Sequence, residues 1–123
     1  MTDTRELLPL VAVLYTVPLL CEAISSALDN IAEVRTFPAG RGDTIGLLKS
    51  IRPDAVVVDD AIEAAEARSW AESQDRPLVH ICLRQRTIRV LRDGDWEESA
   101  GASAASIRNV IAGSMYARRG VGT

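Results

Sequence analysis

Uninterrupted apolar runs alternate along this chain with segments in which apolar residues recur every three or four positions. The strands that these runs predict cover residues 8–15, 56–59, where Asp59 ends the run, and 78–83, where His80 is the one ionisable residue, and each is typical of a strand buried on both faces. A further segment, residues 31–37, alternates apolar and polar positions, which is typical of a strand at a sheet edge. The pattern predicts four strands, of which three are buried.

Helical spacing predicts helices between and after these strands. One begins after Thr16, which we expect to cap it, and a short one begins after its cap Asp43. Two more are expected over residues 61–73 and about 103–118. Strands separated by helices indicate βαβ units and a mostly parallel sheet with helices on both faces, in a single domain over residues 1–123. The expected inward-facing residues are Leu20, Ala23, Ile24, Ala27, Leu28; Ile45, Leu48, Ile51; Ile62, Ala65, Trp70; and Ile107, Val110, Ile111, Met115.

The segment between the last predicted strand and the last helix has two readings. Residues 87–92 and 95–98 form a β-hairpin if Asp93-Gly94 makes the turn that this dipeptide favours. Alternatively, residues 85–92 form a short helix that a weak strand follows. We favour the hairpin, because residues 84–86 are too few for the crossover helix that a further parallel strand would need.

Composition limits the classes of function. The chain has 123 residues, 47% of them hydrophobic, and a formal net charge of −3, so it offers no general attraction for nucleic acid or an anionic membrane. The apolar stretch 7–20 is broken by Pro9 and Pro18 and is too short to span a bilayer. Two cysteines, Cys21 and Cys82, lie in apolar stretches and indicate reduced core residues. We expect a cytoplasmic protein.

The octet Pro53 to Asp60, Pro-Asp-Ala-Val-Val-Val-Asp-Asp, is the most informative segment. A buried strand here ends in two carboxylates, and the carboxyl ends of parallel strands form the crevice where α/β proteins bind ligands. Asp59 and Asp60 therefore occupy a position suited to a phosphoacceptor or a metal ligand. As neighbours on a strand they point to opposite faces, so we do not expect them to chelate one ion together.

This octet, the strand–helix order and the end of the chain, Gly101-Ala102-Ser103 through Val110-Ile111-Ala112-Gly113, resemble the receiver domain of bacterial response regulators. The resemblance covers most of the chain and implies a flavodoxin-like fold. It implies that Asp59 occupies the phosphoacceptor position, and that two-component signalling and transcription regulation are the processes concerned.

The sequence departs from the receiver pattern at three places. Where receivers carry an acidic pair for Mg²⁺, the chain reads Tyr15-Thr16-Val17-Pro18, and where they carry Ser or Thr it reads His80-Ile81-Cys82-Leu83. The only lysine, Lys49, lies in the second predicted helix instead of following the fifth strand. Phosphoryl transfer to a carboxylate needs its negative charge neutralised by a divalent cation. The resemblance is therefore to a degenerate receiver, with no catalytic residues, cofactor or metal expected.

We therefore expect a non-catalytic regulatory domain that works through protein contacts and without phosphorylation. One alternative is a working receiver in which a histidine kinase phosphorylates Asp59. Another is a module that binds a small molecule in the crevice formed by Thr16, Asp59, Asp60 and Cys82. We expect His80 to be a core residue, and residues 40–46 to form an ordinary loop and not a phosphate-binding one.

An arginine cluster in the hairpin region marks the candidate interface. We expect the partner to be another protein or a second copy of the chain, with no membrane contact and no direct nucleic acid contact. An open hairpin edge favours self-association together with the last helix. The candidate interface residues are Arg84, Arg86, Arg89, Val90, Arg92 and Trp96, with Glu97 and Glu98 of a two-fold mate as partners.

Overall fold

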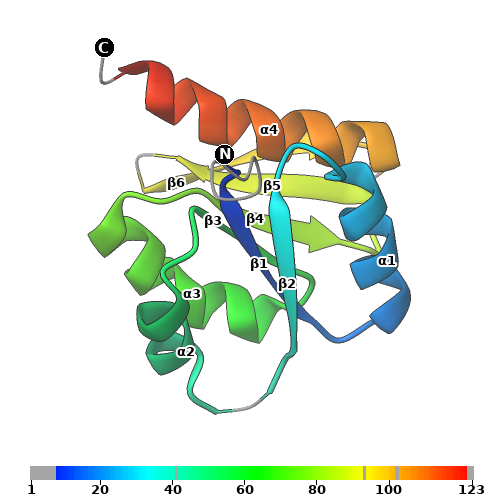
Figure 1. Cartoon of the computed structure of the whole chain (residues 1–123). Coiled ribbons are helices and arrows are strands. Elements are labelled where there is room, and N and C mark those ends of the chain that lie inside the picture. Colours follow the sequence, from blue (N-terminus) through cyan, green and yellow to red (C-terminus); the bar gives the residue numbers. More distant parts are fainter. Residues whose placement is uncertain (1–7, 41, 93, 102, 122–123) are drawn as a thin grey trace, which may run out of the picture.

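A sheet ordered β2-β1-β3-β4-β5-β6 runs through the centre of the molecule, and helices cover both of its faces (Figure 1). The computed structural model describes residues 8–40, 42–92, 94–101 and 103–121. The strands are β1 (Leu10–Tyr15), β2 (Glu33–Pro38), β3 (Ala55–Val58), β4 (Leu78–Cys82), β5 (Thr87–Arg92) and β6 (Asp95–Ala100). The helices are α1 (Pro18–Ala27), α2 (Thr44–Ile51), α3 (Ala61–Gln74) and α4 (Ala104–Val121).

The sheet has a parallel part and an antiparallel part. β1 pairs in parallel with β2 and β3, and β3 pairs in parallel with β4. β5 runs antiparallel to β4 and to β6. The α/β architecture with a mostly parallel sheet is confirmed, as is the position of residues 31–37 at a sheet edge.

The hairpin prediction for residues 87–98 is confirmed, and the alternative of a short helix is wrong. Four residues, Leu83 to Arg86, connect β4 to β5, and the N–H of Arg86 donates to the carbonyl of Leu83 at 3.3 Å. Arg86 has a φ of 55°, which reverses the chain sharply. At the second turn Gly94 has a φ of 83°, as expected for Asp-Gly, although Asp93 lies outside the described residues.

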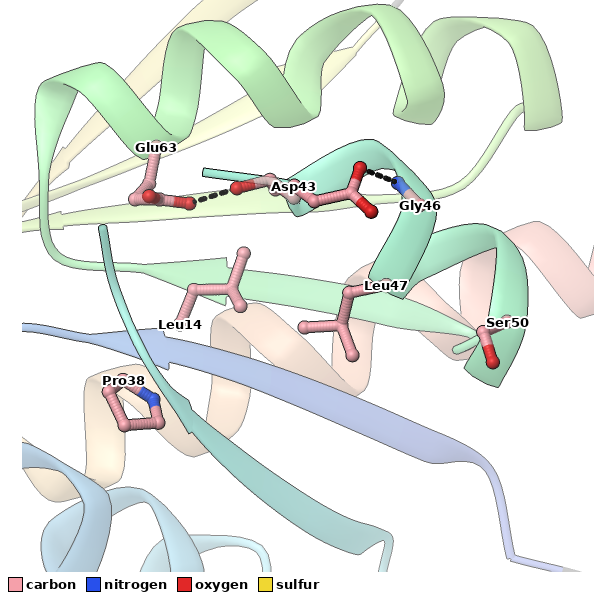
Figure 2. Close-up of a pocket in the computed structure, with 8 residues that line it drawn as sticks. Leu14, Pro38, Asp43, Gly46, Leu47, Ser50 and Glu63 are labelled. Carbon is pink, nitrogen blue, oxygen red and sulfur yellow. Dashed lines mark hydrogen bonds between the residues drawn. The ribbon is translucent and has the colours of Figure 1, made fainter. Parts of the chain in front are cut away.

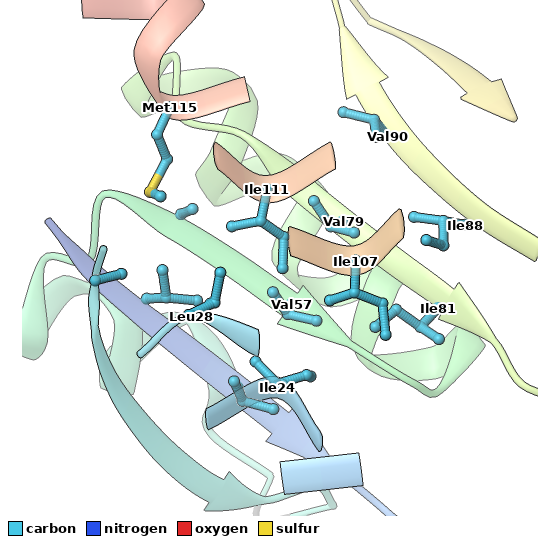
Figure 3. Packing of buried hydrophobic residues seen from close by; sticks show 14 of the residues in the cluster. Ile24, Leu28, Val57, Val79, Ile81, Ile88, Val90, Ile107, Ile111 and Met115 are labelled. Carbon is cyan, nitrogen blue, oxygen red and sulfur yellow. The ribbon is translucent and has the colours of Figure 1, made fainter. Parts of the chain in front are cut away.

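Two apolar layers hold the helices to the sheet. Residues of α1 and α4 pack on one face, where Ile107, Ile111 and Met115 of α4 lie over strand residues such as Val57 (Figure 3). Residues of α2 and α3 pack on the other face, against Val56 and Val58. Successive residues of β3 thus enter opposite layers, which explains why the sequence of this strand is apolar without alternation.

Several local predictions need correction. Thr16 does not cap α1, because Val17 holds the cap position and offers no side-chain hydrogen bond. On α3 the predicted inward residue Ile62 is 69% exposed and Ala65 is also exposed. Alanines on several sides of this helix make its apolar face ambiguous, and burial of Trp70 selects the face that carries Ala64, Ala67 and Ala71.

The other helix predictions agree more closely with the structure. The Asp43 carboxylate caps α2 by accepting from the N–H of Gly46 at 3.1 Å. Ile107, Ile111 and Met115 of α4 are buried. Cys21 and Cys82 are free thiols that are only half buried, so their assignment to the core was too strong. Within the described residues, none of the helices combines the length and apolar character needed to cross a membrane.

Candidate functional site

The carboxylates of Asp59 and Asp60 follow β3 directly, in the middle of the sheet. β3 lies between β1 and β4, so the β1–α1 connection and the start of α3 both begin beside these two residues. This is the position that the sequence predicts for chemistry. The hydrogen bonds that the two carboxylates already make determine whether either can act as a phosphoacceptor or a metal ligand.

Asp59 binds the connection between β1 and α1. Its Oδ1 accepts from the backbone N–H of Thr16 at 2.8 Å and from the Thr16 hydroxyl at 3.0 Å. Its Oδ2 accepts from the N–H of Val17 at 3.0 Å and shares the N–H of Thr16 at 3.0 Å. Both oxygens of the carboxylate thus have donors, and a negative charge sits beside the positive N-terminal end of α1.

Asp60 binds the start of α3 and not the β1–α1 connection. Its Oδ2 accepts from the backbone N–H groups of Ile62 and Glu63, both at 3.1 Å, which caps α3. The two neighbouring carboxylates therefore fix two different helices, and they do not converge on one point. This agrees with the strand alternation that the sequence predicts.

The first acidic residue of the octet is also structural. Asp54 accepts from the N–H of Leu10 at 2.8 Å and pairs with the guanidinium of Arg76 at 3.1 Å. It thereby joins the start of β3 to the start of β1 and to the loop before β4. The Pro-Asp part of the octet, which contributes to the resemblance, has a sufficient explanation in this arrangement.

The negative charge of Asp59 also affects the pKa of the Cys21 thiol on α1. Burial first, and then the Asp59 carboxylate, raise the pKa of the Cys21 thiol above its ordinary value. A thiol with a raised pKa is mostly protonated and weakly nucleophilic at neutral pH. The neighbourhood of Asp59 therefore does not activate Cys21.

The crevice candidates Thr16 and Cys82 have different surroundings. Thr16 is bound to Asp59, whereas the sulfur of Cys82 lies 3.8 Å from Nδ1 and 3.9 Å from Nε2 of His80. Nearly equal distances mean that the sulfur is not directed at either nitrogen, which is not the geometry of a thiol with its general base. His80 is 7% exposed, as predicted for a core residue, and burial and then Arg89 lower its pKa.

The candidate interface residues divide into four groups. Arg84 and Arg86 are exposed in the β4–β5 turn. Arg92 pairs with Glu97 of the same chain at 3.2 Å, so this pair does not need a second molecule. Val90 is only 4% exposed because its side chain enters the layer under α4, so its assignment as an interface residue is wrong. Arg89 and Trp96 contact one another, as described below.

Sequence reasoning missed a buried carboxylate on α3. Glu63 is 3% exposed, and it accepts from the Thr44 hydroxyl at 2.6 Å and from the N–H of Gly40 at 2.9 Å. It lines a pocket of about 430 Å³ between α2, α3 and the ends of β1 and β2 (Figure 2). Gly40 and the start of α2 are thus tied to α3. Because α3 contains several glutamates, the sequence gives no signal that Glu63 in particular makes these bonds.

In the described part of the chain, no three His, Cys, Asp or Glu side chains come close enough together to form a metal site. Comparisons of the chain with family models, curated proteins and solved structures found no match. The resemblance to receivers therefore stays a prediction from the sequence. The hydrogen bonds of Asp59 and the surroundings of the strand ends carry the functional argument.

Proposed function

We propose that this chain is a non-catalytic regulatory domain with a receiver-like, flavodoxin-like fold, which acts through contacts with a protein partner. Asp59 is a structural residue in this proposal and is not phosphorylated. The observation that carries it is the set of hydrogen bonds from Thr16 and Val17 to both oxygens of Asp59. To attack a phosphoryl donor, the carboxylate would have to release donors that hold the β1–α1 connection.

The residues around Asp59 also support a binding role over a catalytic one. The exposed large hydrophobic residues of the described chain all lie where β1, β3 and β4 end, or at the start of the helices that follow. Grouped apolar exposure at one end of a domain is typical of a protein contact surface. These residues are Val17, Leu19, Ile62 and Leu83.

Phosphorylation chemistry tests the proposal directly. The wild-type chain and Asp59→Asn are incubated with acetyl phosphate and Mg²⁺, and separately with beryllofluoride and Mg²⁺. Intact mass and amide NMR spectra are recorded beside a receiver that has the complete acidic set. We expect the control receiver to respond and both forms of this chain to keep their mass and spectra. Stoichiometric modification that Asp59→Asn abolishes would establish the working receiver instead.

A partner or a second copy is part of the same proposal. The exposed arginines Arg84 and Arg86 and the half-buried Trp96 are the hairpin residues available for it. The edge strand β6 also carries Asp95, Glu97 and Glu98, so pairing with an identical β6 brings like charges together. Sedimentation at micromolar concentration, with Trp96→Ala as the test variant, tests self-association: a Trp96-dependent dimer supports it, and a monomer or a dimer that Trp96→Ala leaves unchanged removes it.

The Glu63 pocket favours one second candidate function, a small-molecule module. Its volume of about 430 Å³ is that of an ordinary ligand site, and Leu14, Pro38 and Leu47 supply apolar walls (Figure 2). A metabolite screen by amide NMR tests it. Ligand-dependent shifts at Thr44 and Gly46 would support this location, and shifts at Thr16, Asp59 and Cys82 would support the crevice predicted from the sequence.

The proposal places the domain in the cytoplasm, and transcription regulation is the process that the resemblance suggests. Free thiols at Cys21 and Cys82 support a reducing compartment. DNA contact is not assigned to this domain, because its net charge is −3.

A further inference from the structure

A recess of about 210 Å³ lies between α3 and the β5–β6 hairpin. Alanines at the start of α3 form one wall, and Arg68, His80, Arg89 and Trp96 form the others. Small side chains on the helix leave the space open. The helix also contributes the guanidinium group of Arg68, and the sheet side provides the guanidinium group of Arg89, an imidazole and an indole. Neither Asp59 nor any residue that lines the Glu63 pocket lines this recess.

The positive charge of Arg89 is held in position by Trp96 but has no ion pair within the described residues. Its guanidinium carbon lies 4.8 Å from the centre of the Trp96 ring, which fixes the position of the positive charge. The cross-strand register places Glu98 opposite Arg89, yet within the described residues no carboxylate lies within ion-pair distance of this guanidinium. Arg89 is half buried, so part of its hydration is already lost.

Arg68, in contrast to Arg89, already has hydrogen-bond partners among the described residues. Its Nε donates to Glu72 at 2.6 Å, and its Nη2 donates to the carbonyl of Gly94 at 2.7 Å. The second of these bonds joins α3 to the β5–β6 turn beside the recess. Arg68 thus lines the recess and connects α3 to the hairpin, and Arg89 supplies a charge that pairs with no carboxylate among the described residues.

His80 adds a neutral polar group next to this charge. Its ring centre lies 6.2 Å from that of Trp96 in an edge-to-face contact at 63°, and Arg89 is its cross-strand neighbour. Burial first and Arg89 second lower the pKa of His80, while Asp60 and Asp59 act in the opposite direction. A neutral imidazole offers one N–H donor and one acceptor nitrogen.

We infer that this recess is a binding site for a small oxyanion, a carboxylate or phosphate group, with Arg89 as its charged ligand and His80 as a neutral donor. Guanidinium groups form strong charge-assisted hydrogen bonds to such anions. The volume suits a single anionic group or a very small molecule, since it is below that of ordinary ligand pockets. The inference does not depend on whether Asp59 is phosphorylated.

The chain has a favourable set of reporters for a test, because it contains one histidine and two tryptophans. Sodium phosphate and, separately, sodium succinate are titrated at constant ionic strength into the intact chain. The His80 ring protons are followed by NMR, and Trp96 fluorescence is followed in a Trp70→Phe background. We expect a saturable change in both signals and a rise of the His80 pKa as the bound anion offsets Arg89.

Arg89→Gln is the deciding variant, and Arg84→Gln is its matched control, because Arg84 is exposed and does not line the recess. We expect Arg89→Gln to weaken binding by about tenfold or more, Arg89→Lys to bind with intermediate strength, and Arg84→Gln to match the wild type. The lysine variant keeps the charge if the glutamine variant does not fold. No saturable change up to tens of millimolar anion, or equal binding by folded Arg89→Gln and wild type, would overturn the inference.

Discussion

The parallel part of the sheet and the antiparallel hairpin use their polar residues in different ways. At the ends of β3 and at the start of α3, Asp54, Asp59 and Glu63 accept hydrogen bonds that connect separate elements, and Asp60 caps α3. Beside the hairpin, Arg89 stacks on Trp96 with no carboxylate of the described chain in ion-pair distance. The carboxylates at the end of β3, where an α/β fold is expected to bind ligands, therefore make structural hydrogen bonds. The anion site that we propose lies instead in the recess between α3 and the hairpin.

The largest effect should come from the core of the parallel part. Ile24 of α1 is fully buried, and we expect Ile24→Ala to lower the free energy of unfolding by about 2–5 kcal/mol. Leu19 in the same helix is 72% exposed, so Leu19→Ala should change it by less than about 0.5 kcal/mol. Urea unfolding measures both, and comparable losses from the two variants would contradict the assigned packing of α1.

Arg89→Gln gives the corresponding value for the hairpin in the same experiment. Since Arg89 contributes a cation–π contact and no ion pair within the described chain, we expect a loss of at most about 1 kcal/mol. A loss as large as that of Ile24→Ala would remove the distinction between the two regions.

The buried bond between Thr44 and Glu63 should have the next largest effect. Thr44→Val leaves one oxygen of a buried carboxylate without its donor, and we expect a loss of about 1–3 kcal/mol in the free energy of unfolding. Thr36→Val on the exposed side of β2 is the matched control, with an expected change within about 0.5 kcal/mol. Equal stabilities of the two variants would mean that Glu63 has other donors in solution.

The cap of α3 should contribute less. Asp60→Ala removes the acceptor for the N–H groups of Ile62 and Glu63, and we expect a loss of about 0.5–2 kcal/mol. Asp60→Asn keeps a side chain that caps helices as well as aspartate does, so its thermal midpoint should stay close to that of the wild type. An asparagine variant as unstable as the alanine variant would mean that Asp60 acts through its charge and not through capping.

The smallest expected effect is a pH dependence from His80. Its folded-state pKa is lowered by burial and then by Arg89, whereas in the unfolded chain it should be near 6.5. Above about pH 6.5 both states hold a neutral imidazole, and the full stability is present. As the pH falls below this value, the unfolded chain takes up a proton that the folded chain does not, so stability decreases until the folded-state pKa is passed.

Urea unfolding at neutral and at mildly acidic pH measures this loss, and His80→Gln isolates it from the titration of carboxylates. The wild type should lose more stability on acidification than the variant. If both lose the same amount, the His80 pKa is not lowered in the folded chain.

The sequence predicted the framework well and the roles of its polar residues poorly. Strand positions and the hairpin followed from apolar runs and from Asp93-Gly94, which are local signals. The donors of Asp59 come from residues about forty positions earlier in the chain, and the Glu63 partners lie about twenty positions earlier. Such bonds depend on which elements are neighbours in the sheet, and neither residue type nor spacing encodes them.

Which face of the hairpin packs against α4 could not be predicted, for a related reason. Val90 and Arg89 are adjacent, and alternation alone says that they face opposite ways but not which of the two faces α4 covers. Only the position of α4 decides that Val90 is core and that Arg89 lines a recess. Trp96 becomes part of the recess because the register of β5 and β6 brings it beside Arg89.

Hydrogen exchange at the amides of Thr16 and Val17 tests the central claim, that Asp59 holds the β1–α1 connection. Their exchange is measured by NMR in the wild type and in Asp59→Ala, with the amides of Val11 and Val13 in β1 as internal references. The account predicts that Thr16 and Val17 are protected in the wild type and exchange much faster in Asp59→Ala, while the β1 amides change little. Equal protection of Thr16 and Val17 in both proteins would show that Asp59 is not bound to this connection and that its carboxylate is available for other chemistry.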